Sequence, residues 1–348
     1  MTSAPVRVSV FGKTDLGLTR DHNEDTFLVA DLSTGNASLH PDVRQHEVGP
    51  RGSFFMVADG MGGAAAGELA SAMAAEVIYA HLSSTWAQDE EVSAARFAFR
   101  MKEAVELANQ RIYLYAREHP DVRGMGTTVT AAGVFGDALY LTQIGDSRGY
   151  LVRNGEAFQL TRDQSLTQRL VDAGELTEEE AAQSERRNII LQALGPDPRV
   201  KVDLSHEQLR RGDTLILCSD GLSSVVRREE IAQAVASSPD LPTLCSSLID
   251  LANERGGPDN VTVVAVQFDG EGLPAAGSSD GAGYHVYHVP DGDTTEEPTT
   301  TMELPRPSPV PPVEMAMGSM PAARSHGHLL LVAAAVIALI ALILTVVF

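Results

Sequence analysis

The sequence has little cysteine and little positive charge, and each shortage excludes a class of protein. Its 348 residues include two cysteines, Cys218 and Cys245. These cannot build a disulfide framework or a zinc-ligand pattern, so a reducing compartment is expected. Only 26 Lys and Arg stand against 47 Asp and Glu, which gives a formal net charge of -21 without any basic block. Because such a surface repels a polyanion, we expect no nucleic-acid partner.

The two ends of the chain differ in their content of apolar residues. The first ten residues lack the apolar core of a signal peptide. Residues 329–348, in contrast, form a run of 20 without charge, Gly or Pro, which as a helix would span the roughly 30 Å of a bilayer core. A buried core helix is the alternative, but it is rarely apolar on every face. We therefore expect a C-terminal transmembrane helix that anchors the protein to a membrane, with the folded part in the cytoplasm.

A polar segment precedes this apolar run. Residues 269–328 hold nine of the 18 prolines and many acids, but only two basic residues, Arg306 and Arg324. This composition is typical of a disordered, self-repelling linker. The chain is therefore predicted to consist of a folded domain at 1–268, a disordered acidic, Pro-rich linker at 269–328 and a transmembrane helix at 329–348.

The folded part alternates between strand-like and helix-like patterns. Asn154-Gly155 separates two apolar runs and predicts a hairpin, while residues 163–199 are polar and predict an excursion from the sheet, with a capping box at Thr177 and Glu180. Hairpins outnumber βαβ units, so the pattern favours an α+β fold of packed antiparallel sheets covered by helices. The predicted strands are 6–10, 26–30, 53–58, 127–135, 138–144, 148–153, 157–160, 214–218 and 261–268, and the predicted helices are 64–82, 93–118, 228–236 and 241–255.

Five short segments place aspartate beside glycine or asparagine, mostly where an apolar run begins or ends. If the strands that carry them fold side by side, the carboxylates converge on an oxygen-lined site for hard divalent cations. The absence of Cys and His clusters favours Mg²⁺ or Mn²⁺ over zinc. The segments are Asn23-Glu24-Asp25, Asp59-Gly60-Met61-Gly62-Gly63, Gly145-Asp146-Ser147, Ser219-Asp220-Gly221 and Gly257-Pro258-Asp259-Asn260.

Three of these aspartates carry the strongest signal. Asp59 and Asp220 each follow a buried apolar run, and Asp259 precedes one, so their side chains would be held rigidly. Each alone could equally be a turn residue, but three such turns in one domain favour a metal site. The Gly60 carbonyl is a further candidate ligand. Arg20, just before the first segment, suits bidentate binding of phosphate, the alternative being a surface ion pair with Asp21 or Glu24.

These motifs, together with Gly126-Thr127-Thr128 and Arg148, occur in the order seen in a known family. Residues 6–268 resemble the metal-dependent serine/threonine protein phosphatases of the 2C type (PPM family), in its bacterial branch. The resemblance implies a four-layer α-β-β-α sandwich of two antiparallel sheets flanked by helices. It also implies a centre of two Mn²⁺ or Mg²⁺ ions, with a third in bacterial members, and a variable flap near residues 163–188.

The resemblance assigns roles to the site residues. Asp59 would bridge both metals, Gly60 would offer its carbonyl, and Asp220 and Asp259 would complete one metal. Glu24 and Asp25 would hold metal-bound water or coordinate directly, and Asp146 would help to bind the third ion. Arg20 matches the phosphate-binding arginine; with Asp59, Asp220 and Asp259 it forms the expected catalytic set.

One position departs from the eukaryotic pattern. Met61 stands where those relatives usually carry a histidine, a candidate general acid, so the leaving group must be protonated by metal-bound water or another group. His22 is a candidate for that role, the alternative being a surface or hydrogen-bonded structural histidine. Other phosphate chemistries are excluded, since no Gly-x4-Gly-Lys loop occurs and Cys218 is followed at the Cys-x5-Arg position by Ser224.

The expected function is hydrolysis of phosphoserine and phosphothreonine in proteins by metal-activated water, which would reverse the action of a bacterial Ser/Thr protein kinase. The alternative is a membrane-tethered, non-catalytic relative (a pseudophosphatase) that binds phosphoproteins. That alternative predicts loss of a metal aspartate, and none is lost. A phosphatase acting on an anti-sigma-factor antagonist shares the same chemistry, and the sequence does not separate it from the first.

Overall fold

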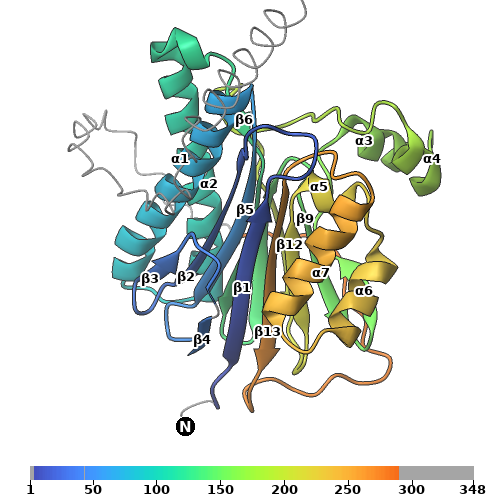
Figure 1. The fold of residues 1–348 in the computed structure, drawn as a ribbon. Helices are drawn as coiled ribbons and strands as arrows, with labels where there is room; N and C mark the ends of the chain where they lie inside the picture. The colour runs from blue at the N-terminus through green and yellow to red at the C-terminus, as the bar shows by residue number, and fades with distance from the viewer. Residues whose placement is uncertain (1–3, 43, 290–348) are drawn as a thin grey trace, which may run out of the picture. The chain divides into compact units, whose positions relative to one another are not determined.

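The computed structural model describes residues 4–42 and 44–289. In this part of the chain, two antiparallel sheets pack face to face (Figure 1). The first sheet consists, in spatial order, of β10 (Glu156–Gln159), β9 (Arg148–Arg153), β12 (Thr214–Cys218), β13 (Val261–Asp269), β1 (Arg7–Asp15) and β4 (Arg44–Glu47).

The second sheet continues the same antiparallel pattern. Its order is β11 (Asp203–Gln208), β8 (Ala138–Ile144), β7 (Val129–Phe135), β5 (Ser53–Met61), β2 (Asp25–Asp31) and β3 (Asn36–Ser38), with β6 (Gly126–Thr127) paired to β5. The sequence pattern misses β3, β4 and β11, because these strands are short or polar and lie at or next to the sheet edges.

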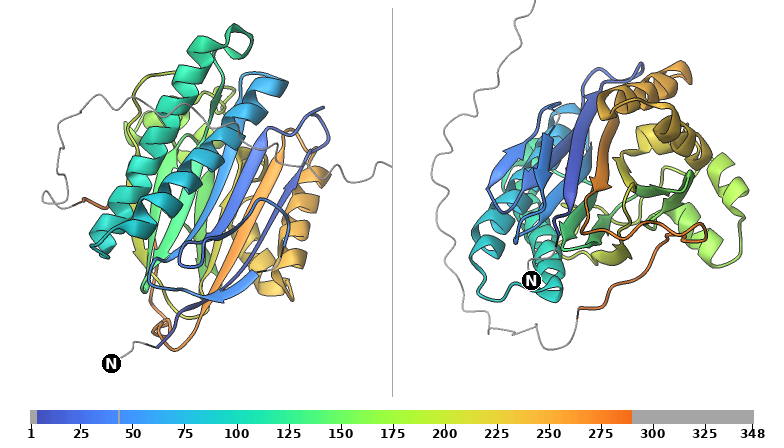
Figure 2. Two further views of the ribbon diagram at one scale, coloured as in Figure 1. Left: turned by 90° about the vertical axis from the view of Figure 1, so that its left-hand side faces the viewer. Right: turned by 90° about the horizontal axis from the view of Figure 1, so that it is seen from below.

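Helices cover both outer faces. The long helices α1 (Ala64–Ser84) and α2 (Ala94–Glu118) lie on the second sheet, and α6 (Arg228–Ser237) and α7 (Leu241–Glu254) lie on the first, as Figures 1 and 2 show. Short 3₁₀ helices at Trp86–Gln88 and Pro120–Val122 follow the two long helices. The predicted four-layer sandwich is thus confirmed for the described residues.

Strand β5 shows why the sheets pack in this way. Phe54, Met56 and Ala58 face the α1/α2 layer, and Phe55 and Val57 face the other sheet, and all five side chains are fully buried. A strand buried on both faces reads as a continuous apolar run, as the sequence predicted. Its last residues, from Asp59 onward, leave this core. The apolar layers on both sides therefore hold the start of the polar motif in place.

The predicted turn and flap features are also present. Asn154 and Gly155 both have positive φ, 53° and 80°, as a type I′ hairpin turn requires. Between β10 and β11, α3 (Leu166–Asp172) and α4 (Glu178–Gln183) project from the sheets (Figure 1). A capping box formed by Thr177 and Glu180 starts α4. A further short helix, α5 (Asp220–Ser223), follows β12 directly.

The segment after β13 departs from the prediction. Residues 270–289, here called the strap, lie against the domain instead of beginning a disordered linker at 269. His206 N–H donates to the His285 carbonyl at 2.9 Å, and Tyr287 N–H donates to the Leu204 carbonyl at 2.8 Å. The strap therefore adds antiparallel pairing to the edge strand β11. The amino-acid composition of this segment wrongly predicted a disordered linker, because backbone hydrogen bonding to a sheet edge needs no apolar pattern.

The expected transmembrane helix at 329–348 and the remainder of the expected linker lie outside the described residues. Among the helices of residues 4–42 and 44–289, none is long and apolar enough to cross a membrane.

Candidate metal centre

The sandwich brings all five acidic segments to one of its ends. Asp25 opens β2 directly opposite Asp59 near the end of β5, in the second sheet. Asp220 opens α5 immediately after β12, and Asp259 comes two residues before β13, in the first sheet. Asp146 lies in the turn between β8 and β9, which belong to different sheets. The convergence predicted from the sequence is therefore present in the structure.

Asp25 joins the two sheets at this end. Its Oδ2 accepts hydrogen bonds from the hydroxyls of Ser219 and Thr262, both at 2.7 Å. These residues belong to the opposite sheet region, beside β12 and in β13. Oδ1 of the same carboxylate is buried and has no hydrogen-bond partner in the structure. One oxygen is thus fixed by the scaffold, and the other is left for a ligand.

Asp59 is held through its backbone. Its carbonyl accepts from Thr127 Oγ1 at 2.9 Å and from Thr128 N–H at 2.8 Å, and its own N–H donates to Thr128 Oγ1 at 3.1 Å. The Thr128 hydroxyl in turn bonds to Ser147 Oγ at 2.8 Å, next to Asp146. Because the backbone carries these bonds, the position of Asp59 is fixed without use of its carboxylate.

Two glycines allow the backbone to pack closely around the site. A Cβ atom on Gly60 would collide with the carbonyl oxygens of Gly67 and Glu24, and one on Gly221 would collide with the Asn260 carbonyl. A larger residue would push the end of β5 away from α1, or α5 away from the chain just before β13. Glycine beside aspartate therefore serves close approach here rather than only a turn.

The carboxylates raise one another's pKa. Burial raises the pKa of Asp25 to about 7 and that of Asp220 to about 6, with repulsion from neighbouring aspartates adding to both. Burial and the charge of Asp220 raise the pKa of Asp146 to about 7. The pKa of Asp59 is raised well above its usual value, first by burial and then by Asp25, Asp220, Asp146 and Asp259. Since Asp59 is repelled by all four others, it lies electrostatically at the centre of the group.

This arrangement fits divalent cations by its donor set. Asp25, Asp146 and Asp220 each keep a buried oxygen without a hydrogen-bond partner. Natural structures rarely leave such atoms unpaired unless a ligand takes that place. Among the described residues, no three acidic, imidazole or thiol groups already stand around one point. The carbonyl of Gly60 and water would complete the coordination.

Arg20 and Glu24 lie at the rim. Arg20 donates to Asp259 Oδ2 at 2.7 Å, so its ion-pair partner is neither of the two expected from the sequence. Half of the Arg20 side chain is exposed, which leaves it free to turn toward a bound anion. Burial raises the pKa of Glu24, and its carboxylate lies against Gly67 of α1.

The sequence assigned no role to the residues that support the acidic segments, although Ser219 and Asn260 belong to those segments. Asn260 receives the Glu24 N–H at 2.8 Å and donates to the carbonyls of Leu16 and His22 at 3.0 and 2.9 Å. It thus joins two of the acidic segments. Asn260 follows Asp259 and Ser219 precedes Asp220, so their position next to a candidate ligand could have indicated a supporting role. Thr262 lies inside a strand and carried no such signal.

Known proteins match both the sequence and this geometry. The sequence model of the family described as Protein phosphatase 2C matches residues 37–254. Serine/threonine phosphatase stp of Listeria monocytogenes is 37% identical over 258 residues, which cover 74% of this chain and 94% of that protein. The solved serine/threonine phosphatase of S. agalactiae superposes with a TM-score of 0.65 at 35% identity, over 75% of this chain and 99% of that one.

A further solved structure contains the metals. It is the catalytic domain of the serine/threonine protein phosphatase PstP in complex with two manganese ions, with a TM-score of 0.61 at 36% identity, covering 76% of this chain and 99% of that one. The chain therefore belongs to the protein phosphatase 2C family of serine/threonine phosphatases, enzymes that use Mn²⁺ or Mg²⁺. The family expected from the motifs is confirmed, and nothing in these relatives favours a non-catalytic role.

Proposed function

We propose that the carboxylate cluster holds two Mn²⁺ or Mg²⁺ ions and hydrolyses phosphoserine and phosphothreonine in proteins. The observation that carries this is the set of buried aspartate oxygens without partners at one end of the sandwich. When bound, two cations lower the pKa of a water molecule and neutralise the phosphoryl oxygens, which is what hydrolysis of a phosphate ester requires.

The residues divide between holding the ions and holding the substrate. Asp59, repelled by every other aspartate of the cluster, suits a bridging position, with the Gly60 carbonyl beside it. Asp220 and Asp259 would complete one ion, and Asp146 would contribute to a third. Glu24 and Asp25 would hold water or coordinate at the periphery, where hydroxyls already orient Asp25.

Arg20 would bind the phosphate. Its guanidinium pairs with Asp259, one of the carboxylates that would hold an ion, and half of the Arg20 side chain is exposed. A planar guanidinium can donate two parallel hydrogen bonds to the phosphoryl group of the substrate. We place no proton donor on Met61, whose thioether cannot supply one. The exposed His22 contributes its backbone carbonyl, which accepts from Asn260.

The test is hydrolysis of a phosphothreonine peptide by the full chain with Mn²⁺, with EDTA and with Mn²⁺ restored. We expect phosphate release only in the first and third conditions. A folded protein that binds Mn²⁺ by calorimetry and still releases no phosphate would contradict the proposal and favour a non-catalytic, phosphoprotein-binding role.

We further propose that residues 329–348 anchor this domain to a membrane with its site in the cytoplasm, where it reverses phosphorylation by a Ser/Thr protein kinase. The support is the uncharged apolar run of 20 residues. The full chain should sediment with membranes and a chain ending at residue 328 should not. Phosphoproteomes of wild-type and Asp220→Asn cells should differ at Ser and Thr sites.

A further inference from the structure

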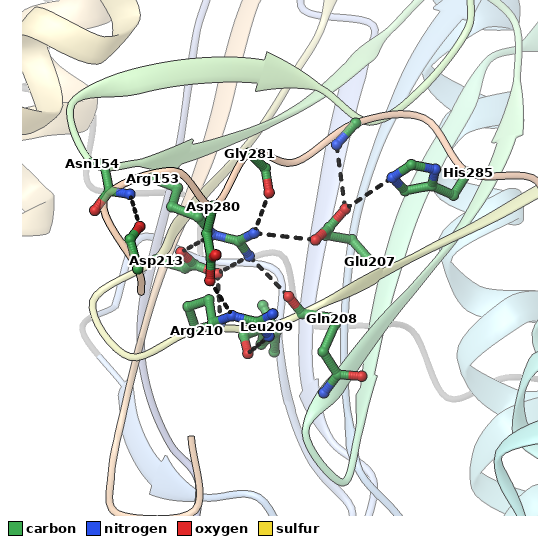
Figure 3. A network of polar contacts seen from close by, with 12 residues as sticks. Arg153, Asn154, Glu207, Gln208, Leu209, Arg210, Asp213, Asp280, Gly281 and His285 are labelled. Carbon is green, nitrogen blue, oxygen red and sulfur yellow. Dashed lines mark hydrogen bonds and ion pairs between the residues drawn. The ribbon is translucent and has the colours of Figure 1, made fainter. Parts of the chain in front are cut away.

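The strap is fixed to the domain by a buried arginine. All five N–H groups of Arg153 have acceptors: the two Asp213 oxygens at 2.9 and 2.7 Å, Glu207 at 3.2 Å, and the Gln208 and Gly281 carbonyls at 2.8 and 2.6 Å (Figure 3). Gly281 belongs to the strap. A guanidinium has five donors, so the strap supplies the last acceptor of a complete set.

Further contacts hold the strap along its length. Asp280 accepts from Arg210 Nε at 2.9 Å, and Gly277 accepts from Asn154 at 2.9 Å. Leu273 is almost fully buried in the core between the sheets. Tyr287 packs edge-on against Tyr140, with ring centroids 5.2 Å apart. The strap therefore joins the domain by polar bonds, backbone pairing and apolar burial together.

A cavity of about 1110 Å³ leads from the metal centre toward the strap. Asp146 and Asp220 of the metal centre belong to its lining, together with residues of α3 and α4 in the flap, and Ala282, Gly283 and Tyr284 of the strap form part of its wall. The volume exceeds the roughly 300–1,000 Å³ typical of a pocket for a drug-sized ligand. It is thus too large for a phosphorylated side chain alone and suits the peptide that carries it.

Tyr284 is the largest strap residue in this wall, and it is fixed in place. Its hydroxyl donates toward both carboxylate oxygens of Asp203 in β11, at 2.9 and 2.7 Å. Phe158 of β10 lines the same cavity, and its ring lies 3.7 Å from the position of a Cβ on Gly281. Phe158 and Tyr284, from separate elements, therefore both contribute aromatic surface to a lining that also contains apolar residues such as Val171 and Val225.

We propose that Tyr284 is a specificity-determining residue: with Phe158, it forms a seat for an apolar side chain near the phosphorylated residue of an extended substrate peptide. This inference rests on the proposed function of the metal centre. The strap follows β13, the last strand of the two sheets, so it would add a substrate-contacting wall outside the sandwich that carries the metal centre. Aromatic faces stabilise bound apolar groups because they bury large areas at fixed geometry.

The experiment compares Tyr284→Ala and Tyr284→Phe with the wild type, on the full chain with Mn²⁺. The substrates are two phosphothreonine peptide libraries, one with Leu and one with Asp at positions flanking the phosphothreonine, and p-nitrophenyl phosphate. Tyr79→Ala is the matched control, because Tyr79 also donates its hydroxyl to another group, the Gly35 carbonyl at 2.7 Å, but does not line the cavity.

We expect Tyr284→Ala to raise KM for the best Leu-flanked peptides about five- to tenfold. KM for Asp-flanked peptides and both constants for p-nitrophenyl phosphate should stay within twofold. Tyr284→Phe keeps the ring, so its KM for Leu-flanked peptides should lie closer to that of the wild type than the KM of Tyr284→Ala does. Tyr79→Ala should leave the preference for Leu-flanked over Asp-flanked peptides unchanged.

Other outcomes overturn the inference. If Tyr284→Ala lowers kcat/KM equally for all three substrates, the residue has only a structural role. If it changes kcat/KM for none of them, the strap does not touch the substrate. A wild type that cleaves p-nitrophenyl phosphate but shows no preference for Leu over Asp also rejects the seat while leaving the metal centre intact. A wild type inert with every substrate rejects the proposed function itself.

Discussion

Around Asp59, at one end of the sandwich, burial and neighbouring carboxylates raise the pKa of four aspartates, and three of these keep buried oxygens without partners. Around Arg153, at the strap, a guanidinium whose side chain is 1% exposed has an acceptor for every N–H, including the carboxylates of Asp213 and Glu207. Both clusters are buried and charged. The aspartate cluster keeps buried oxygens without hydrogen-bond partners, here called the unsatisfied cluster, whereas every donor of Arg153 has an acceptor in the complete cluster.

The difference separates a site from a structural joint. Leaving a buried polar atom unpaired costs free energy of folding, so such atoms persist where a ligand uses them. A fully paired buried ion network instead fixes how elements pack, and it becomes costly only when one member is removed. The two clusters should therefore respond in opposite ways to the loss of a charged group.

The largest effect is expected at the complete cluster. Arg153→Ala would leave Asp213 and Glu207 buried without their partner and should lower the free energy of unfolding by about 3–5 kcal/mol. Urea denaturation followed by circular dichroism measures this. Arg7→Ala is the control, because the Arg7–Asp269 pair is about 60% exposed at 3.6 Å and should cost less than about 1 kcal/mol. Equal losses for both variants would contradict the comparison.

At the unsatisfied cluster, loss of one carboxylate should lower the activity but raise the stability of the metal-free protein. Asp220→Asn should lower kcat by about 10²–10³-fold, the usual cost of removing one group that stabilises transition-state charge. In EDTA the same variant should melt at a higher temperature than the wild type, because one of the repelling carboxylates is gone. Steady-state kinetics and differential scanning calorimetry provide the two readings. A metal-free variant less stable than the metal-free wild type would show that the cluster is not strained.

The pH dependence of the metal-free protein follows from the same repulsion. The pKa values of Asp25 and Asp146 are raised to about 7 and that of Asp220 to about 6, above about 3.9 in an unfolded chain. The folded state therefore binds more protons, and stability is lost as pH rises through the folded pKa values. A lowered pKa of His46 acts in the opposite direction, but it is one group.

In EDTA, the melting temperature should consequently fall by several degrees between pH 5.5 and pH 8. Added Mn²⁺ should reduce or remove this fall, since cations replace protons at the carboxylates. Asp220→Asn, with one titrating group fewer, should show a shallower fall. A metal-free wild type whose melting temperature is unchanged or higher at pH 8 would show that these carboxylates do not titrate as a repelling group.

The unsatisfied cluster could be predicted from the sequence, and the complete one could not. Asp59, Asp146, Asp220 and Asp259 each sit in a local pattern of an apolar strand followed or preceded by glycine, which marks rigid strand ends. Register then brings Asp25 opposite Asp59. These aspartates could be selected from the sequence because each one is marked by the residues directly beside it.

Arg153 and the strap had no local signal. The partners of Arg153 lie 54 to 128 residues away, at Glu207, Gln208, Asp213 and Gly281, so only the folded topology joins them. The composition of the strap matches that of a linker, and its attachment depends on an unpaired edge at β11 that sequence periodicity did not reveal. Pairing at a sheet edge is a property of the neighbouring strand as much as of the segment that joins it.

The smallest effect is expected at the outer bond of the strap. Arg210 and Asp280 are 24% and 35% exposed, so Asp280→Ala should cost no more than about 1 kcal/mol of global stability. Because the bond holds the strap and not the core, amide exchange should quicken in residues 277–287 and stay unchanged in β5. Exchange that quickens equally in both would mean that the strap unfolds only with the whole domain. In that case the Arg153 cluster would belong to the global core, and the strap would not be a separable joint.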